Sequence, residues 1–170
     1  MARPSRPGAD SARRLIRVKI VSGGQTGVDR AVLDAARKLG LPYGGYIPRS
    51  GWTEEGPLAD DYEGMVETVS AGPSRRTKLN VNESDATLII TRGPCEGGTL
   101  LTAETARKAG KPNLILDLAE LGGDAAIAAI HTWLEETRLA SLNVAGPRAS
   151  KDPAIYDDAK QILLAVLRQA

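Results

Sequence analysis

Apolar residues recur along this chain with two different periods, which predicts an alternation of strands and helices. Residues 16–21 alternate apolar and basic side chains, as is typical of a strand with one buried face. Residues 28–39 carry apolar side chains at helical spacing, and Gly40 then provides a stop signal. Between these two segments lies VSGGQTGVDR, at residues 21–30. The chain therefore opens with a strand, a glycine-rich turn and a helix.

The same unit is predicted a second time further along the chain. Residues 86–91 (ATLIIT) read as a strand, RGPCEGG forms the turn, and residues 99–109 form the helix. Other predicted strands span 43–47, 113–118 and 141–145, and other helices span 75–84, 127–134 and the C-terminal segment, with Asp152 as N-cap and Pro153 as first helical residue. Residues 41–73 are interrupted by glycine and proline, which predicts a binding loop with a short helix around residues 60–68.

Strands that alternate with helices favour an α/β fold, here a single-domain Rossmann-like domain with an open, mostly parallel sheet and helices on both faces. We expect this domain to span residues 15–170 and residues 1–14 to form a flexible tail. Ligands bind to such sheets beyond the carboxyl ends of the strands. The glycine-rich turns and the loop after residue 145 should meet at that edge.

Composition narrows the classes of function. The 170 residues carry a net charge of +1, which argues against general nucleic-acid binding. A single cysteine, Cys95, excludes a disulfide framework within the chain and suits a cytoplasmic protein. The first 14 residues lack the apolar core of a secretory signal, and no apolar run is long enough for a membrane span.

The first turn, residues 22–27, predicts a site for phosphate or a similar oxyanion. It departs from the dinucleotide fingerprint, since Ser22 stands where a glycine is needed, and from the P-loop, since it lacks the lysine. The candidate binding residues are Gly23, Gly24, Gln25, Thr26 and Gly27, at the start of a helix whose dipole attracts anions. The alternative is a tight turn followed by a capping box made by Thr26 and Asp29.

The second turn, residues 93–99, follows the same logic. Gly97 and Gly98 expose amides before a helix, and Thr99 adds a hydroxyl group. Glu104, on that helix, is a candidate general base or ribose contact. The alternatives are glycines that serve close helix–strand packing and a glutamate that is simply solvated.

The remaining edge segments add charge and flat side chains. Residues 143–151 bring Arg148 to the end of the last predicted strand, where its guanidinium can pair with an oxyanion or remain solvated. The further binding candidates are Arg49, Asn143 and Ser150. Trp52 and Tyr46 can stack on a heterocycle or merely cover the sheet. Cys95 and His131 are interpreted as packing residues, and no metal site is expected.

Four segments resemble the family labelled putative molybdenum carrier proteins: SGGQTGVDRAVLDAA, GGYIPRSGWTEEGPL, SDATLIIT with GGTLLTAE, and LNVAGPRAS. The resemblance covers residues from about 16 to the C-terminus. It implies a doubly wound fold, a nucleotide-like ligand, and a link to Rossmann-like proteins that include the lysine-decarboxylase-like phosphoribohydrolases and DprA. Gly97, Gly98 and Glu104 match the spacing of the phosphoribohydrolase motif PGGxGTxxE, whereas Leu100 and Leu101 depart from it.

These observations favour a cytoplasmic binding or carrier protein for a phosphorylated heterocycle, for which the resemblance implies the molybdenum cofactor. The alternatives are a phosphoribohydrolase-like enzyme with Glu104 or Asp29 as its acid–base group, and a nucleotide-sensing domain. The apolar helix faces leave room for a homodimer or tetramer.

Overall fold

Six parallel strands form one sheet in the computed structural model, which describes residues 18–168. Their order across the sheet is β3-β2-β1-β6-β4-β5. The strands are β1 (Lys19–Val21), β2 (Tyr43–Ile47), β3 (Met65–Glu67), β4 (Ala86–Thr91), β5 (Asn113–Asp117) and β6 (Ser141–Ala145). The predicted Rossmann-like α/β fold is confirmed, and every strand pair of the described sheet is parallel.

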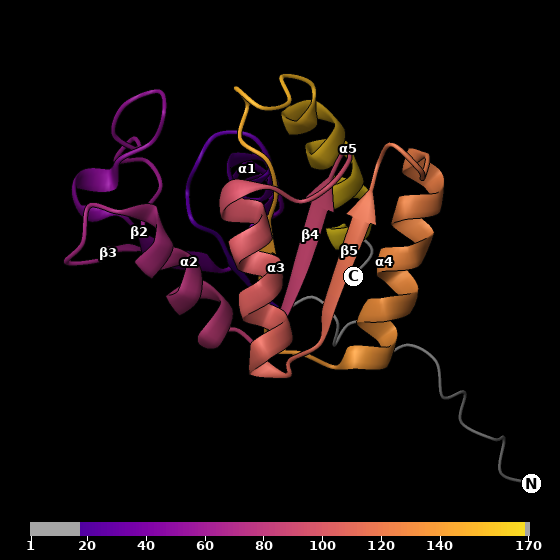
Figure 1. Cartoon of the computed structure of the whole chain (residues 1–170). Helices are drawn as coiled ribbons and strands as arrows, with labels where there is room; N and C mark the ends of the chain where they lie inside the picture. Colours follow the sequence, from indigo (N-terminus) through magenta and orange to yellow (C-terminus); the bar gives the residue numbers. More distant parts are fainter. Residues whose placement is uncertain (1–17, 169–170) are drawn as a thin grey trace, which may run out of the picture.

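Helices cover both faces of the sheet (Figure 1). They are α1 (Val28–Leu39), α2 (Pro73–Asn82), α3 (Gly97–Ala109), α4 (Gly123–Thr137) and α5 (Ile155–Leu167), with the 3-10 turn η2 (Arg49–Gly51). Helix α5 packs between α1 and α4 on one face, while α2 and α3 pack against each other on the other face. Among residues 18–168, no helix combines the length and apolar character that a membrane crossing requires.

The two faces of the sheet differ in polarity, because successive side chains of a strand point to opposite faces. Leu88 and Ile90 of β4 belong to the main apolar core beneath α1, α4 and α5. Thr87, Thr91 and Asn143 point to the opposite face and are also buried. The layer between the sheet and helices α2 and α3 is therefore more polar than the layer on the other face.

Sequence periodicity locates most elements correctly. The strands at 43–47, 86–91 and 141–145 and the helix at 28–39 have the predicted bounds. The short helix expected around residues 60–68 is wrong, because Met65–Glu67 instead pair with Gly45–Ile47 as strand β3. Strand β1 is described only from Lys19, so the beginning of the predicted strand lies outside the described residues.

The other differences between predicted and observed elements lie where the helices begin. Helices α2 and α3 each begin two residues earlier than predicted, and α2 has Pro73 at its start. Helix α5 begins only at Ile155, because Asp152 forms a preceding turn and accepts a hydrogen bond from Ala154 N at 3.2 Å. The capping box proposed for Thr26 is wrong, since Gly27 is the N-cap of α1 and no side chain caps it.

Candidate ligand-binding site

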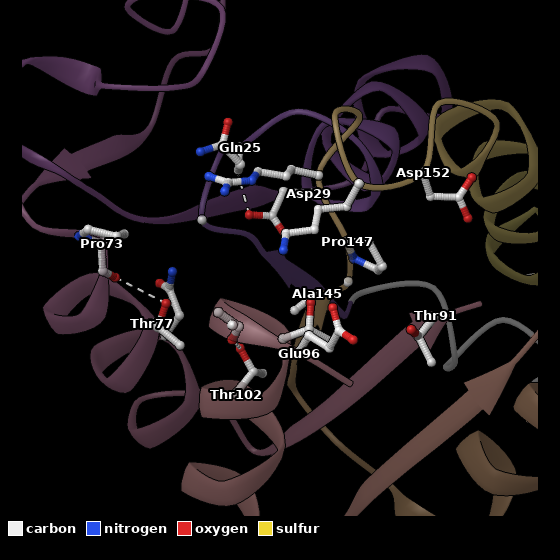
Figure 2. A pocket seen from close by; sticks show the side chains of 18 of the residues that line it. Gln25, Asp29, Pro73, Thr77, Thr91, Glu96, Thr102, Ala145, Pro147 and Asp152 are labelled. Atoms are coloured by element: carbon white, nitrogen blue, oxygen red, sulfur yellow. Dashed lines mark hydrogen bonds between the residues drawn. The ribbon is translucent and has the colours of Figure 1, made fainter. Parts of the chain in front are cut away.

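A cavity of about 380 Å³ opens where strands β4 and β6 end, next to the first turn after β1 (Figure 2). Its walls come from both glycine turns, the starts of α2 and α3, and the segment after β6. Figure 2 shows Gln25 and Asp29, Pro73 and Thr77 of α2, and Thr102 of α3 around the same space. The cavity therefore lies at the carboxyl edge, where parallel α/β sheets bind their ligands.

The first turn uses most of its amides inside the protein. The bonds are Gly24 N to Ser22 Oγ at 3.2 Å, Gln25 N to Asp29 Oδ2 at 3.3 Å, Thr26 N to Gln25 Oε1 at 3.0 Å, and Val28 N to Pro147 O at 3.2 Å. Gly24, Thr26 and Gly27 are buried and do not line the cavity. Because an amide that already donates cannot also hold a phosphate well, this turn works mainly as a structural junction.

Two glycines of this turn allow neighbouring segments to approach closely. Gly27 has φ +77°, and a Cβ there would lie 2.1 Å from the carbonyl oxygen of Pro147. A Cβ on Gly23 would lie 1.9 Å from Nη1 of Arg76. Gly27 therefore brings the segment after β6 against the first turn, whereas a side chain at Gly23 would have to displace the guanidinium of Arg76 from this turn.

The second turn keeps its amides available. Helix α3 has no side-chain cap, and within the described residues the N–H groups of Gly97 and Gly98 have no acceptor. Both glycines line the cavity, and a Cβ at either one would meet only open space. Thr99 also lines it with only 8% exposure, and no described residue bonds its hydroxyl. The anion-binding character expected of a helix start is therefore stronger here than in the first turn.

Arg76 and Asp29 form a buried ion pair in the cavity wall. Their atoms Nη1 and Oδ2 lie 3.4 Å apart, and each side chain is 10% exposed. Arg76 also donates to the carbonyl oxygens of Gly23 and Pro73, so helix α2 is fixed to the first turn. Burial raises the pKa of Asp29, and the Arg76 guanidinium partly opposes this.

Glu54 does not line the cavity but connects three loops next to it. Its carboxylate accepts hydrogen bonds from the hydroxyl of Thr26 and from N and Oγ of Ser150, at 3.0 and 2.5 Å for Ser150. Its own N–H donates to Gln25 Oε1 at 3.0 Å. Burial acts to raise the pKa of Glu54, but the hydrogen bonds from Ser150 and Thr26 outweigh it, so the pKa is lowered.

Basic side chains gather at the cavity mouth. Arg148 and Lys151 both line it; Arg148 is 42% exposed, and its Nε lies 3.5 Å from Glu54. Arg92 also lines it but is paired with Asp152, at 2.7 Å, and with Asp158. The positive charge of Arg148 and Lys151 is therefore the less compensated part of this group.

Two further side chains suit the ring of a ligand. Trp52 lines the cavity and is 46% exposed, so one part of its indole remains uncovered. Asn143 lines it from β6 with only 3% exposure, and its Nδ2 lies 3.5 Å from Thr87 Oγ1. One offers a stacking surface and the other a buried carboxamide.

Comparison with known proteins places the chain in a family. The model of the circularly permutated YpsA SLOG family matches residues 20–167. The chain belongs to this family. A crystal structure of a protein described as "putative molybdenum carrier protein" from Syntrophus aciditrophicus SB is similar to it, with 42% identity and a TM-score of 0.85. That match covers 89% of this chain and 95% of the other. A comparison with curated proteins finds no match.

Not all predicted site residues meet in this member of the circularly permutated YpsA SLOG family. The cavity brings together Gly23, Gln25, Asp29, Gly97, Gly98, Thr99, Asn143 and Arg148. Arg49, Ser150 and Glu104 are exposed and do not line it. Tyr46 also lies outside its lining and donates to Glu83 at 2.6 Å. Cys95 and His131 are likewise outside it.

Arg76 lines the cavity but is not among the site residues predicted from the sequence. The sequence places Arg76 and Asn80 one helical turn apart, but only the structure shows that both of these polar residues are buried. Asn80 bonds the backbone of Tyr46 through Oδ1 and Nδ2, at 2.7 and 3.0 Å. Over residues 18–168, no group of three or more histidine, cysteine or acidic side chains is placed to hold a metal ion.

Proposed function

We propose that this protein binds a phosphorylated heterocyclic ligand in the cytoplasm and acts as its carrier. The observation that carries the proposal is the pair of unbonded amides at Gly97 and Gly98, which face a cavity with Arg148 and Lys151 at its mouth. A helix start with unpaired N–H groups and nearby cations favours a phosphate. The exposed indole of Trp52 then provides a surface for the ring.

The molybdenum cofactor, a pterin with a terminal phosphate, is the first candidate, because a similar protein is described as a "putative molybdenum carrier protein". The cavity has room for a small organic molecule. Its volume of about 380 Å³ lies within the range of small-molecule sites. In this proposal the phosphate of the ligand lies at Gly98, and its ring lies near Trp52.

A hydrolase acting through Glu104 has less support from the geometry. Glu104 is exposed on α3 and does not line the cavity, while Asp29 lines it but is paired with Arg76. A screen of nucleoside monophosphates for base release addresses this alternative, with Glu104→Gln beside the parent. If the parent releases base and Glu104→Gln does not, the protein is an enzyme rather than a carrier.

Binding is tested in two steps. Mass spectrometry of the natively purified protein should reveal a co-purifying phosphorylated heterocycle, and calorimetry should then give saturable binding of that compound. Arg148→Gln should weaken binding roughly 10-fold or more, since a charge-assisted contact is lost. Arg49→Gln is the matched control, because Arg49 is an exposed arginine outside the cavity. Equal effects of both variants, or no saturable binding at all, would refute the proposal.

A further inference from the structure

Polar atoms without partners remain on the innermost wall of the cavity, on residues more than nine-tenths buried. Gln25 and Arg76 are each 8% exposed, Asp29 is 7% exposed and Asn143 is 3% exposed. Polar atoms that line a cavity and have no partner within the protein are available to hydrogen bond a ligand there. The donor and acceptor character of each atom therefore describes the ligand's inner end.

Gln25 is fixed as a donor. Its Oε1 accepts hydrogen bonds from the backbone N–H groups of Thr26 and Glu54, both at 3.0 Å. Two N–H donors on one atom identify that atom as the oxygen and leave the amide nitrogen, Nε2, as the other end. No described residue accepts a bond from Nε2. The side chain thus presents two N–H donors.

Arg76 adds donors beside it. Its Nε and Nη1 are bonded to Pro73, Gly23 and Asp29, whereas Nη2 donates to no described residue. Arg76 and Asp29 balance each other's charge at 3.4 Å. Since this part of the wall is close to neutral, it suits a carbonyl oxygen better than a second phosphate.

Asp29 and Asn143 supply acceptors. Oδ2 of Asp29 takes the bonds from Gln25 N and Arg76, and Oδ1 takes none from a described residue. The carboxamide of Asn143 lies 3.5 Å from the hydroxyl of Thr87; because that hydroxyl can bond either end of the amide, Asn143 can turn its Oδ1 toward a donor of the ligand. The fully buried polar atoms without partners in the described structure lie elsewhere, so these atoms keep access to the cavity.

Resting on the proposed function, we infer that the inner wall recognises a ring with a 2-amino-4-oxopyrimidine edge, the edge shared by guanine and pterins. Its carbonyl accepts from Gln25 and Arg76, and its ring N–H and amino group donate to Asp29 and Asn143. Hypoxanthine has the carbonyl and the ring N–H but no amino group. Adenine offers only its amino group as donor and has no carbonyl.

Calorimetry on the full chain separates these cases with four probes: guanosine, inosine and adenosine 5′-monophosphates, and 6-hydroxymethylpterin monophosphate. The guanine and pterin compounds should bind at least about 10-fold more tightly than the hypoxanthine compound, and the adenine compound should bind most weakly, because unpaired buried groups penalise the wrong ring. Equal affinity for all four overturns the inference and leaves the proposed function standing. No binding by any probe overturns both.

Asp29→Asn provides the second test. The variant removes the charged acceptor, so the preference for guanine over hypoxanthine should fall to less than about 3-fold. Asp34→Asn is the matched control on the same helix, since Asp34 accepts from Tyr62 at 2.6 Å and does not line the cavity. A preference that survives Asp29→Asn overturns the inference. If the variant does not fold, the probe series decides alone.

Discussion

The buried ion pair between Arg76 and Asp29 gives the strongest test of how the cavity wall is held together. Arg76→Met keeps an apolar side chain of similar length but leaves the carboxylate of Asp29 buried without its cation. Two charges 3.4 Å apart attract by about 5 kcal/mol at an effective dielectric constant of about 20. Removal of one partner from a buried pair costs about 3–5 kcal/mol. We therefore expect a loss of that size.

The assay is urea unfolding followed by circular dichroism, for the parent, Arg76→Met, Asp29→Asn and the double variant. The bonds from Arg76 to Gly23 and Pro73 are lost in both variants that lack Arg76, so they cancel in the double-mutant cycle. What remains should be a coupling of about 2–4 kcal/mol, with the double variant more stable than Arg76→Met.

The pH dependence supplies a second criterion with a definite sign. Burial raises the pKa of Asp29, and the loss of Arg76 should raise it further. A raised pKa in the folded state means that acidification stabilises the fold relative to the unfolded chain. The deficit of Arg76→Met should therefore shrink as the pH falls from 7 to 5. Three results would refute this reasoning: a loss of unfolding free energy below about 1 kcal/mol in Arg76→Met, additive losses in the double-mutant cycle, or an equal loss in Arg75→Met, the control at an exposed arginine.

Three further predictions concern the loops around the cavity. Gly27→Ala should cost about 2–4 kcal/mol of unfolding free energy because its Cβ would meet a carbonyl oxygen, whereas Gly40→Ala, also at positive φ but in open space, should cost only about 1 kcal/mol. Glu54→Gln should lower the free energy of unfolding by about 1–2 kcal/mol at pH 7. Because the pKa of Glu54 is lowered in the folded protein, this difference should vanish as the pH falls below the ordinary glutamate range. A difference that stays constant with pH would contradict the prediction. Ligand binding should quench the fluorescence of Trp52 in a Trp133→Phe background; unchanged emission at saturation would exclude stacking.

The fold could be predicted because its signals are local. Strand β4 is six buried residues long, and helix α1 keeps an apolar face over three turns, so period and burial agree. Strand β3 was missed because three residues at the sheet edge, with Val66 and Glu67 exposed, give no such pattern.

The position of the cavity was predictable, but the details of its wall were not. Glycine-rich turns after two buried strands lie at the carboxyl edge of the sheet, where the cavity opens. Whether a turn's amides are available, however, depends on partners far along the chain: Val28 N bonds to Pro147 O, 119 residues away. Similarly, Arg76 reaches Asp29 across 47 residues. Such contacts form only after packing, and no local pattern carries them.

The position of β6 has a consequence for how the chain is made. This strand is the last along the sequence, yet it pairs with both β1 and β4 at the centre of the sheet. Until residues 141–145 leave the ribosome, β3-β2-β1 and β4-β5 have no strand to join them. Such long-range pairing slows folding and leaves edges exposed on the nascent chain. The cavity is thus among the last parts of the molecule to form, and a chain cut short before residue 141 lacks the β6 residues that line it.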